Sequence, residues 1–138
     1  MTGAMDDPTR QFLHDRARHR CEYCHLPQAG HEEAFSIDHV IARKHRGPDA
    51  AANLALCCLR CNLFKGTDLS SIDTADGAIV PLFNPRTDEW SVHFRWNGPL
   101  IVGVSASGRA TVALLRFNAP ERVRLRQALL LERILRLD

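Results

Sequence analysis

Five cysteines carry the clearest chemical signal in this sequence. Four of them form two C-x-x-C pairs, Cys21/Cys24 and Cys58/Cys61, with 33 residues between the pairs. Two thiolates three positions apart can bind one metal ion from a tight turn, and two such pairs complete the tetrahedral shell of a structural zinc site. The separation exceeds the usual spacing of paired knuckles, so the intervening segment is expected to be a structured insertion.

Disulfide bonds and a redox-active C-x-x-C motif are the alternatives to a zinc site for these cysteines. Met1–Arg20 has no apolar stretch, so no secretory signal is expected. We therefore expect a cytoplasmic location, and the reducing conditions of that compartment disfavour two disulfides. A redox C-x-x-C needs a thioredoxin-like context, which is absent here. Cys57 is interpreted as a buried apolar thiol, or as a substitute for Cys58. His25 and His31 are interpreted as surface residues, with spare ligation as the alternative.

A second set of polar side chains lies between the two pairs and just after them: Asp38, His39, Asn53, Asn62 and Lys65. The oxygens of Asp38 and Asn62 are hard ligands of the type that Mg²⁺ accepts while keeping several waters. His39 directly follows Asp38, so on a regular strand the two side chains point to opposite faces. A shared site for both residues therefore requires a bend in the backbone.

The elements that must position these residues can be predicted from local patterns. We expect a helix over 8–20, a strand over 35–41 with partly alternating apolar residues, and a loop over 42–52 that contains the Gly47-Pro48 breaker. Residues 54–57 suit a second short strand. Residues 59–65 suit one or two helical turns that Gly66 ends.

The second half of the chain predicts an extension of different character. Residues 77–84 are predicted to be a loop, and Trp90, Val92, Phe94 and Trp96 alternate with polar residues as on a half-buried strand. Asn97-Gly98 is a strong two-residue hairpin signal, with 100–104 as the returning strand. Helices are expected over 108–117 and 120–137. The arginines of the last helix (122, 124, 126, 133 and 136) are expected on a solvated face, with DNA binding as the alternative, and Leu125, Leu129 and Ile134 are expected behind them.

The D-H-V-I motif at 38–41 and the N-L-A-L-C-C-L-R-C-N-L-F-K-G motif at 53–66 resemble the HNH endonuclease family, the ββα-metal or His-Me finger nucleases. The resemblance covers about a third of the chain and implies that His39 is the general base and Asp38 a metal ligand. It also implies that Asn53 braces the loop that orients His39. Asn62 takes the place of the last histidine of the family name, as in the H-N-N variant, and would also bind the metal. Ala42 and Gly47-Pro48 depart from the usual proline and Gly-Gly, which leaves the loop shape open.

The resemblance and the local patterns together predict an α+β fold. Its zinc-stapled ββα-metal core is expected over 8–66, and the C-terminal extension of a β-hairpin and two helices is expected over 67–138. The resemblance also implies a nuclease with structural Zn²⁺ and catalytic Mg²⁺ or Mn²⁺, acting on DNA, most simply as duplex. Arg43, Lys44, Arg60 and Lys65 are the candidates for phosphate contacts, which position DNA without reading its sequence. The net charge of +2 and pI of about 8.4 do not by themselves mark a nucleic-acid-binding protein.

Two other functions compete with the nuclease. One is a catalytically inactive zinc-knuckle module that binds nucleic acid, and the other is a protein-interaction adaptor built on the C-terminal helix. The same helix could pair two copies of the chain in a homodimer. No apolar run approaches the length of a membrane span, so no membrane partner is expected.

Overall fold

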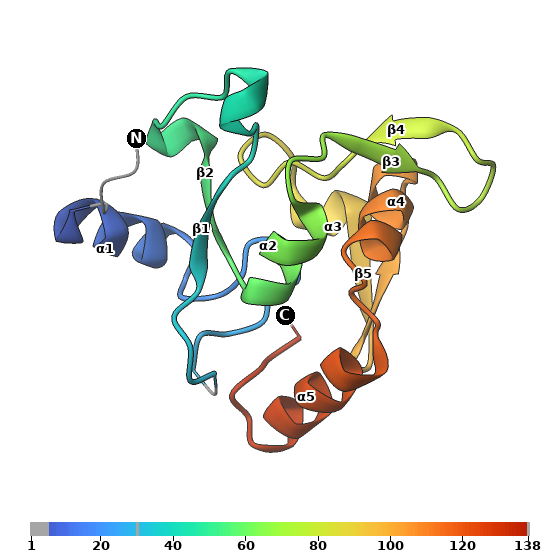
Figure 1. The fold of residues 1–138 in the computed structure, drawn as a ribbon. Coiled ribbons are helices and arrows are strands. Elements are labelled where there is room, and N and C mark those ends of the chain that lie inside the picture. The colour runs from blue at the N-terminus through green and yellow to red at the C-terminus, as the bar shows by residue number, and fades with distance from the viewer. Residues whose placement is uncertain (1–5, 30, 138) are drawn as a thin grey trace.

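A computed structural model describes residues 6–29 and 31–137, and Figure 1 shows its mixed arrangement of helices and short strand pairs. The described residues form five α-helices and three two-stranded antiparallel sheets. The predicted α+β fold class is therefore confirmed. The division of the chain into a core over 8–66 and an extension over 67–138 stays a prediction.

The first helix, α1 (Asp7–Arg16), begins where Asp6 accepts a hydrogen bond from the backbone N–H of Thr9 at 2.8 Å. A carboxylate at this position satisfies one of the free N–H groups of a first helical turn. The helix ends earlier than predicted, because Arg18 and His19 adopt left-handed backbone angles with φ of 57° and 55°. This turn leads the chain into the first cysteine pair.

The next three elements form the predicted strand, strand and helix. β1 (Ser36–His39) pairs antiparallel with β2 (Leu54–Cys57), in the register Ser36 with Cys57 and His39 with Leu54. α2 (Leu59–Lys65) follows β2 directly and packs against β1 (Figure 1). It ends at Gly66, which has a φ of +53° that favours glycine.

The prediction of a loop over residues 77–84 is wrong in part, because this segment contains a strand. β3 (Ser70–Ile72) and β4 (Ile79–Pro81) form a small hairpin in which Ile72 pairs with Ile79. Both isoleucines are exposed, so the apolar residues of these strands do not mark a buried face in the sequence.

The predicted strand over 90–96 is also wrong in its first half. Residues Trp90–His93 form a short helix, α3, and only β5 (Phe94–Asn97) is extended. Val92 is therefore 58% exposed rather than on a shared apolar face, although the Trp90 and Trp96 rings still lie 5.5 Å apart. β5 turns at Asn97-Gly98 into β6 (Leu100–Gly103), as predicted.

Two helices complete the chain: α4 (Ala106–Leu114) and α5 (Pro120–Leu131). The expectation that the α5 arginines share a solvated face is wrong for two of them. Arg122 and Arg126 are 6% and 1% exposed, whereas Ile134 is 36% exposed. The two arginines are spaced four residues apart, so they lie on the same face of α5 as buried Leu129.

One apolar cluster extends through both halves of the chain. It joins Phe35 and Leu56 of the strand-strand-helix unit to Phe94, Ile101 and Leu115 of the extension. Among the helices of residues 6–29 and 31–137, none combines the length and apolar composition that crossing a bilayer needs.

Candidate metal centre and nuclease site

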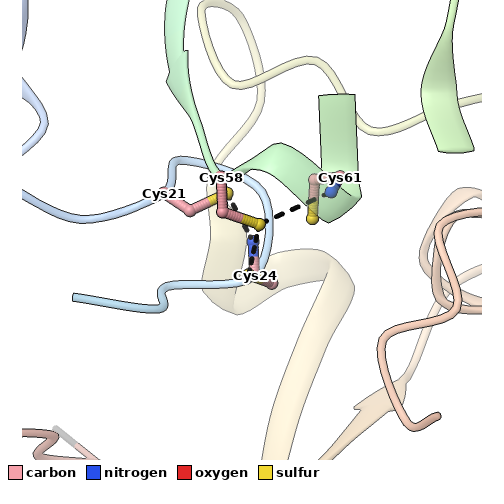
Figure 2. A group of neighbouring side chains, drawn as sticks. All are labelled: Cys21, Cys24, Cys58 and Cys61. Atoms are coloured by element: carbon pink, nitrogen blue, oxygen red, sulfur yellow. Dashed lines mark hydrogen bonds between the residues drawn. The ribbon is translucent and has the colours of Figure 1, made fainter. Parts of the chain in front are cut away.

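The two C-x-x-C pairs meet in the interior. Cys21 and Cys24 come from the loop after α1, and Cys58 and Cys61 from the start of α2 (Figure 2). All four sulfur atoms lie within 4.8 Å of one another, and the Cys24 and Cys58 sulfurs are 3.7 Å apart. Zinc bonded to four sulfurs at about 2.3 Å sets them roughly 3.8 Å apart. The four cysteines can therefore hold one zinc ion, as their spacing predicted.

The four sulfurs of this group interact with one another and with the first turn of α2. Burial raises the pKa of the Cys21 thiol, while hydrogen bonds from Cys21, Cys58 and Cys61 lower the pKa of Cys24. Cys58 begins α2 and accepts a hydrogen bond from the Cys61 N–H at 3.4 Å. Cys57 lies outside the quartet, where its thiol contacts the Cys58 carbonyl at 3.4 Å, so its interpretation as a separate buried thiol is confirmed.

Asp38 points from β1 into the interior and is 4% exposed. Its carboxylate accepts a 2.7 Å hydrogen bond from the Tyr23 hydroxyl and lies 3.2 Å from the Lys65 ammonium. Burial raises the pKa of Asp38, while the charge of Lys65 and the Tyr23 hydrogen bond oppose that rise. Both carboxylate oxygens are thus already engaged by groups of the protein.

Lys65 was predicted to contact phosphate, and the structure corrects this prediction. Its side chain is 2% exposed, and its ammonium donates to Asp38 and, at 3.2 Å, to the His39 carbonyl. Burial of a lysine requires compensating partners, and β1 supplies both of them. Lys65 therefore holds α2 against β1 and is not available at the surface.

His39 lies on the other side of β1 and is partly exposed. Its Nε2 atom lies 2.8 Å from Asp49 Oδ1, and the same oxygen accepts a 2.9 Å hydrogen bond from Arg43 Nε. Hydrogen bonds from Arg43 and His39 lower the pKa of Asp49. The histidine is thus oriented by an ionised carboxylate that comes from the loop after Gly47-Pro48.

Asn53 braces the same loop through three hydrogen bonds. Its side chain accepts from the Ile41 N–H and donates to the carbonyls of Ile41 and Pro48, each at 2.9 Å. Gly47 allows this close packing, because a Cβ atom there would lie 1.7 Å from the Ile41 carbonyl oxygen. Asn53 therefore occupies the position that its expected bracing role requires.

Asn62 is half-buried on α2, and its carboxamide has no hydrogen-bond partner among the residues that the structure describes. The other candidate phosphate ligands are exposed: Arg43, Lys44 and Arg60. Arg43 pairs with Asp49, and Arg60 lies 3.6 Å from Glu121 of α5, at the zinc end of α2.

The two adjacent site residues of β1 thus belong to two separate groups. Asp38 lies with Tyr23 and Lys65 in the interior, and His39 lies with Asp49 on the other side of the strand. Lys65 links Asp38 to the backbone of His39, but the two side chains point to opposite sides of β1, as regular strand geometry requires. Sequence reasoning missed Asp49 and Tyr23, the partners of these two residues. The position of Asp49 after a Gly-Pro turn was the one available signal.

The extension contacts both cysteine pairs. Trp90 donates from its indole N–H to the Tyr23 carbonyl at 2.8 Å and stacks on His25, with ring centroids 4.1 Å apart. Arg86 pairs with Glu22, which also accepts from the Leu56 N–H. At the second pair, the Arg122 guanidinium lies 3.1 Å from the Cys61 sulfur and 3.5 Å from the Cys58 sulfur.

Comparison with known proteins agrees with this arrangement. Residues 21–68 match the HNH endonuclease family. Septu protein PtuB from Bacillus thuringiensis is 26% identical over 114 residues, which make up 80% of this chain and 41% of that protein. The chain thus spans about two fifths of the length of this curated relative. No solved structure matches.

The matched residues contain both cysteine pairs, β1, β2 and α2, and thus every residue on which the resemblance was based. An HNH domain suggests a nuclease and a nucleic-acid substrate. Residues 21–68 of this chain are an HNH endonuclease domain.

Proposed function

We propose that this chain is a metal-dependent endonuclease that hydrolyses phosphodiester bonds of DNA, by nicking or by cutting both strands. The observation that carries the proposal is the His39–Asp49 contact of 2.8 Å within the matched HNH segment. A partly exposed imidazole oriented by a carboxylate is the arrangement that a general base needs.

His39 is proposed to take a proton from the attacking water. If its Nε2–H donates to Asp49, Nδ1 carries the free lone pair that accepts this proton. Histidine can make this exchange near neutral pH. Asp49 would then hold the ring in one orientation and stabilise the imidazolium that forms.

A divalent ion, Mg²⁺ or Mn²⁺, is proposed to bind at Asn62 and Asp38. The Asn62 carboxamide fits this role because its oxygen is not used by the described residues. Asp38 fits only if it exchanges the Lys65 ammonium for the ion, since both of its oxygens are engaged. When bound, such an ion would stabilise the charge that grows on the phosphate and the leaving oxygen.

Zinc is proposed to be structural and to bind Cys21, Cys24, Cys58 and Cys61. A closed shell of four thiolates has no open position for water, so it takes no part in cleavage. Arg43, Lys44 and Arg60 are proposed to contact backbone phosphates. A homodimer through the C-terminal helix and a cytoplasmic location stay predictions.

One observation favours the second candidate, an inactive zinc-knuckle module that binds nucleic acid. The Asp38 carboxylate is neutralised by Lys65, so an additional cation must compete with an internal ion pair. A chain that never exchanges this pair would bind nucleic acid without cutting it.

Relaxation of a supercoiled plasmid in Mg²⁺ or Mn²⁺ separates the two candidates. The wild type is expected to nick the plasmid, and His39→Ala is expected to lose ~10²–10⁴-fold in rate, the usual contribution of a general base. His45→Ala is the matched control, since His45 is exposed in the same loop and its side chain bonds the Thr67 carbonyl instead of Asp49. A wild type that retards DNA on a gel but leaves the plasmid intact across a panel of divalent ions would support the inactive module.

A further inference from the structure

Arg122 is a buried cation that the nuclease proposal does not use. α5 carries it against the zinc end of α2, where one terminal nitrogen donates to the Leu115 carbonyl at 2.6 Å and the Arg116 carbonyl at 3.2 Å. The other terminal nitrogen faces the sulfurs of Cys61 and Cys58. One guanidinium therefore contacts both the end of α4 and the second cysteine pair.

Burial of this guanidinium requires negative charge nearby. Arginine keeps its charge at any ordinary pH, and an uncompensated buried charge is strongly destabilising. Within residues 6–29 and 31–137, no carboxylate lies within ion-pair distance of Arg122. The cysteine quartet, whose sulfurs are thiolates when they bind zinc, is the group that can balance it.

Arg126 adds a second buried cation one helical turn further along. Its Nε donates to the Pro99 carbonyl at 2.6 Å, and a terminal nitrogen donates to Asn118 at 3.1 Å. Asn118 in turn binds both the N–H and the carbonyl of Ile101. Arg126 thus ties α5 to the β5–β6 hairpin, and it lines the same cavity as Cys24, Cys58 and Arg122.

The charges of the two arginines match the charge of a loaded zinc site. Four thiolates around one Zn²⁺ carry a net charge of minus two, and the two guanidiniums carry plus two. A buried assembly of this kind is neutral as a whole, and this pairing offsets part of the cost of burying each charge.

We propose that Arg122 and Arg126 neutralise the four-thiolate zinc centre, so that zinc binding and docking of α5 are coupled. Arg122 acts as a positioning residue through its N–H contacts with the sulfurs, and Arg126 acts through its charge. The inference rests on the structural zinc site proposed above and is independent of whether the chain cleaves DNA.

The consequence for the metal is slower release and less reactive sulfurs. A hydrogen bond to a thiolate withdraws electron density from it, and loss of such outer contacts commonly weakens metal binding by about 10- to 100-fold. Removal of the Arg122 charge is therefore expected to release zinc at least about tenfold faster.

The test compares three substitutions on α5 in the full chain. Arg122→Gln removes the charge but can still donate to the Leu115 carbonyl, Arg122→Lys keeps the charge, and Arg124→Gln changes an exposed arginine of the same helix. Zinc release to a coloured chelator is followed at a temperature where each protein keeps its native circular dichroism. We expect fast release from Arg122→Gln and nearly wild-type release from Arg122→Lys and Arg124→Gln.

A cobalt-substituted protein gives a readout that a purely structural role would not move. The sulfur-to-cobalt charge-transfer band is expected to shift to lower energy in Arg122→Gln, because the thiolates lose a hydrogen-bond donor. The same band is expected to stay in place in Arg124→Gln.

The outcomes separate this inference from the zinc site itself. A wild-type protein that binds neither zinc nor cobalt refutes the zinc site. A zinc-loaded protein in which Arg122→Gln and Arg122→Lys release zinc equally slowly, with an unshifted cobalt band, refutes the role of Arg122. If Arg122→Gln does not fold, Arg126→Gln removes the second charge without losing a sulfur contact, and wild-type zinc release from it refutes the charge argument.

Discussion

The ammonium of Lys65 lies 3.2 Å from the carboxylate of Asp38, and both side chains are buried. The pair joins the end of α2 to the middle of β1, and Tyr23 completes it from the first cysteine loop. The two elements on either side of the candidate site are therefore held by a charge interaction in the interior. The same carboxylate is the one that the family resemblance assigns to a metal ion.

Substitution of Lys65 by methionine is expected to destabilise the fold strongly. It leaves a buried carboxylate without its cation, a change that typically costs roughly 3–5 kcal/mol. The free energy of unfolding in urea measures the loss.

Lys44 provides the matched control, because it is the other lysine of the chain and is exposed. Lys44→Met is expected to leave stability unchanged, and an amine-specific reagent is expected to label Lys44 but not Lys65 in the native protein. Equal labelling of the two lysines would contradict the buried pair.

Asp49→Asn is expected to lower cleavage by ~10- to 10⁴-fold, where the upper value is the loss seen when a triad aspartate is replaced. The amide cannot stabilise the imidazolium that His39 becomes when it takes the proton. The rate of plasmid nicking measures the loss. Glu32→Gln, at an exposed position, should keep the wild-type rate, and an unchanged rate in Asp49→Asn would show that Asp49 does not orient the base.

The strand, strand and helix of the HNH segment could be predicted because the signals there are local. The cysteine spacing, the short apolar run at 54–57 and the glycine at 66 each depend on residues close in sequence. The prediction failed where distant contacts decide the structure. Trp90 begins a helix instead of a strand because its indole docks on the Tyr23 carbonyl, 67 residues away in the sequence.

The buried arginines show the same limit. Arg122 and Arg126 look like a solvated face because arginine is seldom buried without a partner. Their partners are the cysteine sulfurs and the carbonyls of Leu115 and Pro99, which only the fold brings near α5. The orientation of His39 by Asp49 likewise depends on the shape of the 42–52 loop, which the sequence left open.

The two site asparagines are expected to respond in opposite ways to alanine. Asn53→Ala removes three hydrogen bonds of the loop and should cost roughly 1–3 kcal/mol of stability. Asn62→Ala removes no side-chain hydrogen bond to residues 6–29 or 31–137, so its stability should match the wild type while plasmid cleavage falls. Unfolding and nicking are measured on the same two samples, and a stable, active Asn62→Ala would remove Asn62 from the site.

Asp73 is expected to govern part of the acid sensitivity of the extension. It binds Arg109 through both oxygens, at 2.8 and 3.0 Å, and this contact lowers its pKa from 3.8 to about 2. A carboxyl group whose pKa is lower in the folded protein than in the unfolded chain stabilises the fold at pH values above its unfolded-state pKa. This stabilisation is lost as the pH falls through its folded-state pKa. The contribution should thus be complete above about pH 4 and disappear toward pH 2.

Melting temperatures measured across this range test the assignment. Asp73→Asn should melt lower than the wild type at neutral pH and should lose less stability between pH 4 and pH 2. Asp68→Asn, at an exposed position, should follow the wild-type curve. Parallel curves for Asp73→Asn and the wild type would show that the Arg109 pair contributes nothing to acid stability.

Zinc removal is expected to unfold the domain, whereas removal of Mg²⁺ is expected only to stop cleavage. Binding of zinc contributes on the order of 10–16 kcal/mol in small zinc modules, as much as the whole stability of an ordinary domain at ~5–15 kcal/mol. The adjacent cysteines allow a close comparison, since Cys58 belongs to the quartet and Cys57 does not. Cys58→Ser should lose zinc and native circular dichroism, and Cys57→Ser should keep both. If the chelated wild type kept its circular dichroism and melting temperature, the core would be held by its apolar contacts and not by the metal.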